Sequence, residues 1–481
     1  MNSKWKVAGW LALGAIAGAL ATMQFQASAR GATSALPLEE MQQFAAAFSI
    51  IKSDYVDPVD EKKLITDAIS GMVAGLDPHS EYFDKKAFKE FREVTSGRFV
   101  GVGIEIGMED GLVKVVSPIE GSPAFRAGIK SGDLITKIDD TFVKGLTMDQ
   151  AVKRMRGEPN TKVVLTIFRK SENRSFVVPI VREEIRVQSV RAKEIDPGYV
   201  WVRISQFQDH TVDDFVKKVS ALYKQDPKIK GFVLDLRNDP GGLLESAVGI
   251  ASAFLPPDSV IVSTNGQIPE SKAVFKARPE DYAAREGEDP LAGLPPALKT
   301  VPLVVLVNEG SASASEIVAG ALKDHKRGVI MGAQTFGKGS VQTVRQLSPE
   351  TALKITTARY YTPSGASIQA KGIVPDVMLD ETAEGNLFAA LRTREADLDK
   401  HITSGQGAEV KDEAREKARE EARKKLEEEA VKRAAAPIKP QPEFGSAEDF
   451  QLAQALNRLK GKPVLVSKTA VERKPEAETT N

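Results

Sequence analysis

Apolar runs and helical segments alternate along the chain from Tyr199 to about Leu379. The apolar runs are Val200–Ile204, Gly231–Leu236 and Val301–Val307, and the helical segments are Val212–Leu222, Leu243–Phe254 and Ala314–Lys323. Apolar strands separated by helices predict a parallel or mixed α/β sheet. The stretch from Asn265 to Pro302 carries proline, glycine and charge, and we expect it to be a surface insertion.

The segments before this region have other periodicities. The chain has 481 residues, which exceeds one hydrophobic core and favours about three domains. Arg98 to Val181 is typical of short strands with one helix, Thr147–Met155, which Thr147 caps. Leu36 to Phe91 has helical spacing, broken by a turn at Pro78.

The segments after the α/β region are simpler in composition. Glu409–Lys432 consists almost wholly of charged residues and alanine, which predicts a solvated helix. Ala434–Pro442 is a proline-rich linker, and Asp449–Leu459 predicts a small amphipathic helix before a disordered tail. We expect the apolar stripes of the terminal helices to serve assembly with other chains; the alternative is packing within the chain.

The first thirty residues predict export. Lys4 and Lys6 precede an apolar run, Val7–Met23, and the small residues Ala27–Ala29 follow it. This order is typical of a secretory signal peptide cleaved after Ala29, and the alternative is an uncleaved membrane anchor. No later segment is apolar for long enough to cross a membrane. Either way, we expect the bulk of the chain to leave the cytoplasm.

Composition excludes several classes of function. Lysine plus arginine equals aspartate plus glutamate at 66 each, so no global field favours nucleic acid. The chain has no cysteine, which excludes disulfides, thiolate zinc sites and cysteine nucleophiles. Its four histidines are scattered and no H-E-x-x-H motif occurs, so we expect neither metal nor organic cofactor. These histidines are His79, His210, His325 and His401.

A serine-rich stretch, Asn308–Glu316, follows an apolar strand and precedes a helix. A serine at such a turn is exposed, and the free N–H groups of the helix start stabilise a developing oxyanion. The plainer alternative is that these serines only cap the helix. A nucleophile elbow of the G-x-S-x-G type is excluded, because Gly310–Ala314 ends in alanine.

Lys338 lies between two glycines in the stretch Gly332–Gln342. Glycine permits close approach of the backbone, and apolar surroundings would lower the pKa of this ammonium. A neutral lysine is a general base for a nearby serine, and Gln342 has the groups needed to orient its amine. The spacing also fits a phosphate loop, but Gly339 replaces the serine or threonine and a strand follows, which disfavours nucleotide binding.

A third turn, Asp235–Leu243, also connects an apolar strand to a helix. It is either a tight turn with glycines at the helix start or a source of a backbone amide directed at an oxyanion.

Together these three turns resemble the C-terminal processing peptidases, or tail-specific serine proteases. Other stretches that match are Leu76–Ser80, Thr362–Gly365, Ser367–Gln369 and Gly372–Asp376, so the resemblance covers roughly residues 36 to 400. It implies an α+β multidomain protein whose mixed α/β protease core is ClpP/crotonase-like. Ala366 is a departure, because relatives often have arginine there.

The resemblance also implies catalytic roles. Ser313 would be the nucleophile, Lys338 the general base and Gln342 the residue that orients the lysine. The oxyanion hole would use the amide of Ala314 and one amide from Gly241 or Gly242.

The region from Arg98 to Val181 resembles a PDZ domain inserted before the protease core. Its carboxylate-binding loop would be Gly101, Val102, Gly103 and Ile104, and a peptide would add as a strand between Ile104, Glu105 and Ile106 and the helix Thr147–Met155. In this family the PDZ domain gates access to the catalytic site. Arg169 is a candidate for transmitting that signal.

The domain boundaries follow from these readings. We expect a signal peptide or anchor over 1–29, a helical region over 30–97, the PDZ domain over 98–181, the protease core over 182–381, a charged helical segment over 382–435 and a C-terminal oligomerisation segment with a disordered tail over 436–481. The predicted function is a periplasmic serine endopeptidase that cleaves envelope proteins with flexible C-termini, as a homo-oligomer and with an activator or adaptor protein in the envelope. The alternative is a catalytically inert periplasmic PDZ scaffold or chaperone.

Overall fold

The computed structural model describes residues 37–109, 111–285, 287–383, 391–407, 416–417, 419–424 and 442–467. The predicted signal peptide and disordered tail, and all but the last residue of the proline-rich linker, lie outside these ranges. The chain divides into two units, residues 1–72 and 73–481. Within the described ranges, no helix has the length and apolar character needed to span a bilayer.

The first unit contains helix α2 (Leu38–Asp54) and most of α3 (Glu61–Ala74). Two acidic residues in the first turn of α2 and Lys52 in its last turn suit the helix dipole, and Lys52 pairs with Glu61 at 2.7 Å. No side chain of α2 is buried, and its large apolar residues Met41, Phe44 and Ile50 are exposed. The apolar residues predicted for this helix are therefore not covered.

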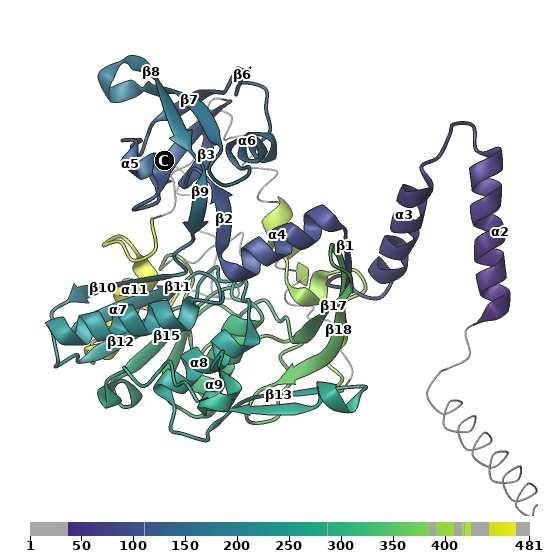
Figure 1. The fold of residues 1–481 in the computed structure, drawn as a ribbon. Helices are drawn as coiled ribbons and strands as arrows, with labels where there is room; N and C mark the ends of the chain where they lie inside the picture. Colours follow the sequence, from purple (N-terminus) through teal and green to yellow (C-terminus); the bar gives the residue numbers. More distant parts are fainter. Residues whose placement is uncertain are drawn as a thin grey trace, which may run out of the picture. The chain divides into compact units, whose positions relative to one another are not determined.

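The second unit is built on a six-stranded sheet. Its strands, in spatial order, are β10 (Val190–Asp196), β11 (Tyr199–Ile204), β12 (Gly231–Asp235), β15 (Leu303–Val307), β16 (Val329–Gly332) and β19 (Val377–Met378). The first four are labelled in Figure 1. Neighbours from β11 to β19 are parallel and β10 is antiparallel. The predicted mixed α/β sheet is confirmed.

The central strands β12 and β15 are apolar up to Asp235 at the end of β12, because both faces of the sheet are covered. Val202, Leu234 and Val305 belong to the core formed with helices α7 (Thr211–Gln225), α8 (Leu244–Phe254) and α9 (Ala314–Asp324). The alternate residues of the same strands, among them Val233 and Val304, belong to a second core with α11 (Phe450–Leu459). A strand that alternates its side chains between two cores has no solvent-facing position for a polar residue.

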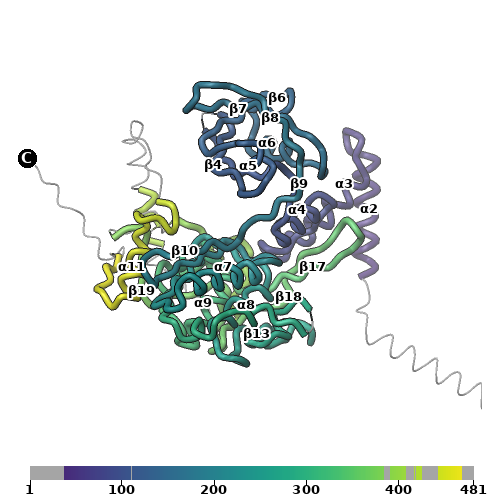
Figure 2. The backbone as a smooth tube through the Cα atoms, turned by 60° about the vertical axis from the view of Figure 1, so that its left-hand side comes forward, coloured from purple at the N-terminus to yellow at the C-terminus, as the bar shows by residue number. Residues whose placement is uncertain are grey.

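Helix α11 packs against β12 and β15, and its first turn lies near the end of β19, about 70 residues earlier in the sequence (Figure 2). Gln451 Nε2 donates to the carbonyl of Leu379 at 2.9 Å, and Leu452 and Ala455 are buried against the sheet. The apolar stripe of this helix, which we expected to serve assembly, is thus covered within the chain. Of the predicted charged helix Glu409–Lys432, the described residues 416–417 and 419–424 are helical.

A second sheet borders the first. Its strands are β1 (Glu81–Phe83), β13 (Val260–Gly266), β14 (Ala273–Lys276), β17 (Ser340–Ser348) and β18 (Thr351–Tyr361). The expected surface insertion Asn265–Pro302 contributes β14, and its Leu298 is fully buried. The segment is mostly at the surface, as expected, but Leu298 and the partly buried Phe275 pack against the main core.

The PDZ region has its own sheet and core. Its strands are β3 (Ile104–Glu109), β4 (Leu112–Pro118), β5 (Leu134–Ile138), β6 (Thr141–Phe142), β7 (Lys162–Arg169) and β8 (Arg174–Val181). Helices α5 (Pro123–Arg126) and α6 (Met148–Met155) complete it, and Thr147 caps α6 as predicted. The chain enters through β2 (Arg98–Gly101) and leaves through β9 (Glu183–Arg186), which pair with one another.

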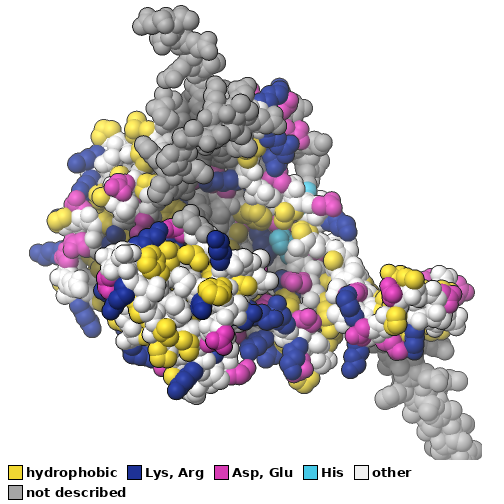
Figure 3. All heavy atoms as spheres, turned by 90° about the horizontal axis from the view of Figure 1, so that it is seen from above, with side chains coloured by type: hydrophobic (Ala, Val, Ile, Leu, Met, Phe, Trp, Pro, Cys, Tyr) yellow, Lys and Arg dark blue, Asp and Glu magenta, His cyan; other side chains and the backbone are white. Residues whose placement is uncertain are grey.

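Acidic and basic side chains are interspersed on the face of the molecule shown in Figure 3. This agrees with the zero formal net charge and with the absence of a global field for a polyanion.

We expect Leu234→Ala in β12 to lower the free energy of unfolding by about 2–5 kcal/mol, because it leaves a cavity in a fully buried site. Urea unfolding followed by the fluorescence of Trp201 in the adjacent strand measures this. Leu347→Ala, at a 55 % exposed position, is the matched control and should change it by less than about 0.5 kcal/mol. Equal effects of the two substitutions would contradict the assignment of the core.

Candidate active site

The fold brings together the three turns singled out in the sequence. Each follows one of the neighbouring parallel strands β12, β15 and β16, whose carboxyl ends meet at one edge of the sheet. Ser311 Oγ donates to the carbonyl of Leu236 at 2.7 Å, which joins the first two turns. The N–H of Phe336 donates to the carbonyl of Ser311 at 3.0 Å, which joins the second and third.

The three serines of the second turn differ in how their hydroxyls are used. Ser311 Oγ bonds Leu236, and Ser315 Oγ donates to the carbonyl of Asp239 at 2.9 Å. Ser313 stands at the N-cap of α9, yet its side chain makes no capping hydrogen bond. Among the described residues its hydroxyl has no hydrogen-bond partner. Helix capping therefore does not account for Ser313.

Ser313 also has a rare backbone conformation, with φ 54° and ψ −110°. A positive φ is unfavourable for a residue with a Cβ and persists only where the surroundings impose it. The backbone N–H of Ser313 donates to Glu316 Oε2 at 2.8 Å, which supplies part of that constraint. The side chain is 8 % exposed, so the hydroxyl lies just below the surface.

The carboxylate of Glu316 is fully buried and connects the second turn to the third. Its Oε2 accepts from the N–H of Ser313 at 2.8 Å and from the N–H of Lys338 at 2.9 Å. Its Oε1 accepts from Gly337 N at 2.7 Å and from Thr335 Oγ1 at 2.5 Å. The backbones of the predicted nucleophile and the predicted base are thus fixed by one oxygen atom.

Burial raises the pKa of Glu316 to about 7, although its four donors favour the ionised form. The sequence reasoning did not assign a role to this residue. The signal was present, because Ser313 and Glu316 have the spacing of a capping box, in which the third helical residue reaches back to the N-cap amide.

Lys338 is half-buried, and its surroundings favour the neutral form of its amine. Burial lowers the pKa of Lys338 to about 8, and the positive charge of Lys354 contributes to this shift. Within the described part of the chain, the Nζ atom forms no hydrogen bond or ion pair, and none joins it to Ser313 Oγ in this conformation. A lysine with this pKa is partly neutral near neutral pH.

The glycines around Lys338 permit close packing, as predicted. The N–H of Gly339 donates to Gln369 Oε1 at 2.8 Å, and a Cβ on Gly339 would lie 2.2 Å from the backbone nitrogen of Gln369. Gln369 Nε2 in turn donates to Glu395 Oε1 at 2.8 Å, and His79 pairs with Glu395 at 2.8 Å. Leu76–Ser80 and Ser367–Gln369, two of the stretches that carry the family resemblance, therefore both support the lysine turn, Gly332–Gln342.

Gln342 is not bonded to Lys338. Its Nε2 donates to Ser340 Oγ at 3.0 Å and to Thr356 Oγ1 at 3.3 Å. The orienting contact expected between this amide and the lysine amine is absent from this conformation, because Gln342 lies in β17 with its amide held by neighbouring hydroxyls. Its predicted role stays a prediction.

Of the two glycines proposed for the oxyanion hole, only one has a free amide among the described residues. The N–H of Gly241 donates to Asp239 Oδ1 at 2.9 Å, whereas the N–H of Gly242 has no acceptor in that part of the chain. A Cβ on Gly241 would lie 2.8 Å from the nitrogen of Ala314 and 2.9 Å from the Cβ of Ser313. The glycine turn therefore lies directly against the start of α9.

None of the four histidines forms a serine–histidine pair at this site. His210 accepts from Arg98 Nε at 2.9 Å, and the rings of His325 and His401 contact the carbonyls of Val260 and Leu398. Neither these nor His79 bonds Ser313. The described residues contain no group of histidine and acidic side chains suited to a metal ion.

The predicted carboxylate-binding loop of the PDZ region has free amides. The N–H groups of Val102 and Gly103 donate to no described residue, while the carbonyl of Gly103 accepts from Ser122 Oγ at 2.8 Å and so fixes the loop. Strand β3, with Ile104, Glu105 and Ile106, is at the edge of its sheet. An unpaired edge beside free amides is the arrangement needed for peptide addition.

Arg169 is engaged within the PDZ region. Its guanidinium forms two hydrogen bonds with Asp133, at 2.7 and 2.8 Å, and one with the carbonyl of Gly128 at 2.9 Å. It is buried, and these contacts hold the loop before β5. Its predicted regulatory role stays a prediction.

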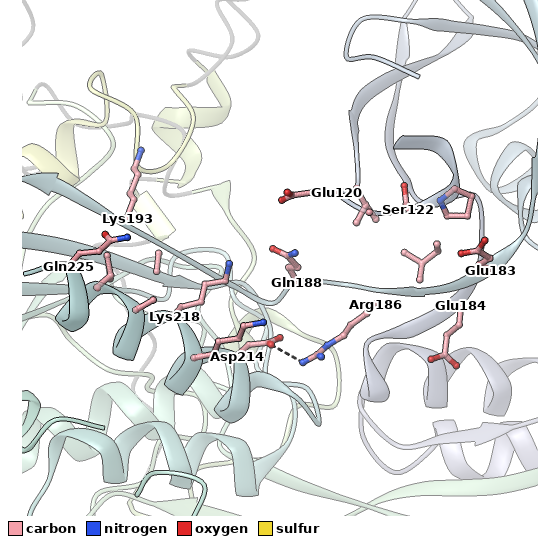
Figure 4. A pocket seen from close by; sticks show the side chains of 18 of the residues that line it. Glu120, Ser122, Glu183, Glu184, Arg186, Gln188, Lys193, Asp214, Lys218 and Gln225 are labelled. Carbon is pink, nitrogen blue, oxygen red and sulfur yellow. Dashed lines mark hydrogen bonds and ion pairs between the residues drawn. The ribbon is translucent and has the colours of Figure 1, made fainter. Parts of the chain in front are cut away.

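A cavity of about 700 Å³ lies apart from these turns (Figure 4). Residues of the PDZ region, β9, β10 and α7 line it, and side chains of both charges face it, with Arg186 bonded to Asp214 at 2.7 Å. Neither Ser313 nor Lys338 lines this cavity.

Comparison with known proteins agrees with this description. A model of peptidase family S41 matches residues 198–379, a PDZ model matches 100–180, and a model of the N-terminal domain of the activating protease CtpB matches 9–87. The chain is 43 % identical over 346 residues to a carboxy-terminal-processing protease of Bartonella bacilliformis, covering 71 % of this chain and 76 % of that protein. It is 40 % identical over 360 residues to a probable CtpA-like serine protease of Staphylococcus aureus, covering 74 % and 68 %.

Among solved structures, a photosystem II D1 C-terminal processing protease is 30 % identical, with a TM-score of 0.39, and covers 71 % of this chain and 93 % of that one. The α/β core with its PDZ domain defines a serine-type peptidase. The chain belongs to the carboxy-terminal-processing proteases of peptidase family S41, and the resemblance stated from the sequence is confirmed.

We expect Glu316→Gln to lower kcat/KM by about 100-fold or more, because an amide has one acceptor oxygen and its NH₂ group would face the N–H donors. Hydrolysis of an unstructured peptide measures this. Glu245→Gln, an exposed position in the first turn of α8, is the control and should retain full activity. Wild-type turnover by Glu316→Gln would show that the two turns need no shared carboxylate.

Proposed function

We propose that this protein hydrolyses peptide bonds with Ser313 as nucleophile and Lys338 as general base. One observation carries the assignment of the serine. Of the three serines in the turn, only Ser313 has a hydroxyl without a hydrogen-bond partner among the described residues, and it lies at the start of a helix in an imposed backbone conformation. The shared carboxylate of Glu316 and the low pKa of Lys338 support the assignment of the base.

The reaction is acyl transfer. Neutral Lys338 Nζ takes the hydroxyl proton as Ser313 Oγ bonds to the carbonyl carbon of the substrate. The lysine gives this proton to the leaving amine as the C–N bond breaks, which leaves an ester on Ser313. A water molecule then loses a proton to Lys338 and its oxygen bonds to the acyl carbon. The ester bond breaks, and Ser313 Oγ recovers the proton. For this step Nζ must lie within hydrogen-bond distance of Oγ.

The oxyanion of each tetrahedral intermediate requires two N–H donors. The amide of Ala314 is in the first turn of α9, where no helical carbonyl accepts from it. We assign the second donor to Gly242 rather than Gly241, because the Gly241 amide is already bonded to Asp239. The free amide of Gly242 and the positive end of the α9 dipole both favour a negatively charged oxygen beside Ser313.

The substrates we propose are exported proteins with flexible C-termini. The free amides of Val102 and Gly103 and the open edge of β3 would bind the terminal carboxylate and the preceding residues. Binding of the substrate to the PDZ domain would gate the catalytic site, and we expect this to occur in the periplasm of the cell envelope.

The reaction as written needs no cofactor. The exposed apolar residues of α2 favour assembly with a second copy of the chain, and an adaptor protein remains part of this proposal.

We expect Ser313→Ala and Lys338→Ala each to lower kcat by about 10⁴-fold or more, because one removes the nucleophile and the other the base. Hydrolysis of an unstructured peptide by the purified variants measures this, with circular dichroism to show that each is folded. The controls are Ser348→Ala and Lys272→Ala, which alter residues outside the three turns and should retain activity. Residual activity near wild type in either catalytic variant would refute the assignment.

The pH dependence follows from the lysine. Only neutral Lys338 accepts the proton, so below about pH 8 we expect kcat/KM to fall roughly tenfold per pH unit. Lys354→Gln removes a positive charge that lowers the pKa of Lys338, so its profile should move to higher pH. Lys272→Gln, outside the site, should leave the profile in place. A profile independent of pH from about one unit below to about one unit above the expected pKa would exclude lysine as the base.

A further inference from the structure

The side chain of Arg237 is 1 % exposed, and the residue belongs to the glycine turn, Asp235–Leu243, four positions before Gly241. Its Nε and Nη2 donate to Asp235 at 2.9 and 2.6 Å. Its Nη1 and Nη2 also donate to Asp449 at 2.9 and 2.7 Å, and Nη1 donates to Gln451 Oε1 at 2.9 Å. Two carboxylates that are far apart in the sequence therefore bind one guanidinium.

Asp449 organises the C-terminal segment around this contact. It caps α11 by accepting from the N–H of Leu452 at 3.1 Å, and its Oδ2 accepts from the N–H of Gly445 at 2.9 Å. The ring of Phe444 covers the guanidinium, 4.2 Å from its central carbon. The segment from Phe444 to Gln451 is thus folded onto Arg237 rather than merely packed near it.

The backbone on both sides of Arg237 holds the serine turn. The carbonyl of Leu236 accepts from Ser311 Oγ at 2.7 Å. The carbonyl of Asp239 accepts from the N–H of Ala312 at 2.9 Å and from Ser315 Oγ at 2.9 Å. A displacement of Arg237 would therefore move both the glycine turn and the residues that flank Ser313.

The charges make Asp449 necessary. Arg237 and the partly buried Arg203 face Asp235, whose Oδ1 is 3.5 Å from Arg203 Nη1. Burial opposes the charge of Arg237, but Asp235 and Asp449 together raise its pKa above the ordinary value. Without Asp449, Asp235 would be the one described carboxylate hydrogen-bonded to the buried guanidinium of Arg237, and it also faces Arg203, so this guanidinium would be under-compensated.

We propose that Asp449 is a positioning residue for the catalytic centre. Through Arg237, the C-terminal segment 444–451 holds the glycine turn, Asp235–Leu243, in the position that the oxyanion hole requires. This inference rests on the proposed function of Ser313 and the glycine turn. The last described helix is then a part of the active site's support.

The test compares Asp449→Asn with Leu452→Ala in the full-length protein. The asparagine side chain keeps the capping oxygen and one acceptor for Arg237 but removes the charge, whereas Leu452→Ala loosens the packing of α11 and leaves Arg237 untouched. We expect Asp449→Asn to lower kcat by about 10- to 100-fold with KM for a peptide nearly unchanged. Leu452→Ala should lower the melting temperature but keep kcat at about 25 °C, a reference temperature well below the melting range of ordinary domains.

The rate at which a fluorophosphonate labels Ser313 gives a second readout, and it should fall with kcat in Asp449→Asn. If kcat follows the melting temperature equally in both variants, or if Asp449→Asn has wild-type kcat, the inference is wrong. Should Asp449→Asn not fold, Gln451→Ala decides, since it removes one acceptor of Arg237: a loss of kcat at constant KM supports the proposal and wild-type kcat overturns it.

Ser313→Ala in the same assay separates this inference from the proposed function. Activity that persists in Ser313→Ala refutes the serine assignment whatever Asp449→Asn does. Activity that depends on Ser313 but not on Asp449 refutes only the positioning role.

Discussion

The hydrogen bonds of the buried Glu316 carboxylate are the interactions on which the geometry of the proposed catalytic site depends. Burying an ionised group is costly unless donors surround it, and here four donors come from two separate turns. The cost of leaving Glu316 unsatisfied therefore acts against any arrangement in which the serine turn and the lysine turn are apart. Ser313 and Lys338 are held by their backbones, which leaves the side chains free for chemistry.

Much of the fold could be predicted from the sequence because strong local patterns coincide with the final structure. The apolar runs at Gly231–Leu236 and Val301–Val307 are strands of the sheet, and the cap at Thr147 begins a helix. For the segment containing β14 the sequence predicted the surface location but not the strand, because proline and charge dominate its composition while a few apolar side chains fix its position. Composition averages over residues whose individual contacts decide burial.

The turns of the candidate site could be predicted from the sequence, but the long-range contacts that hold them together could not. The turns that carry Ser313, Lys338 and the two glycines could be found because each has an unusual local sequence. The contacts between Arg237 and Asp449 and between His79 and Glu395 could not, since each joins residues more than 200 positions apart. For Gln342 the sequence spacing was suitable for a contact with Lys338, but it did not determine the hydrogen-bond partner. In the structure the amide donates to Ser340 instead.

The paired strands β2 and β9 have a consequence for how such a protein diversifies. The chain enters and leaves the PDZ domain through the paired strands β2 and β9. The loops of the domain can therefore be lengthened, shortened or exchanged with no change in the register of the main sheet. Substitutions and insertions within residues 102–182 can therefore accumulate in evolution while the strands that carry the three turns keep their pairing.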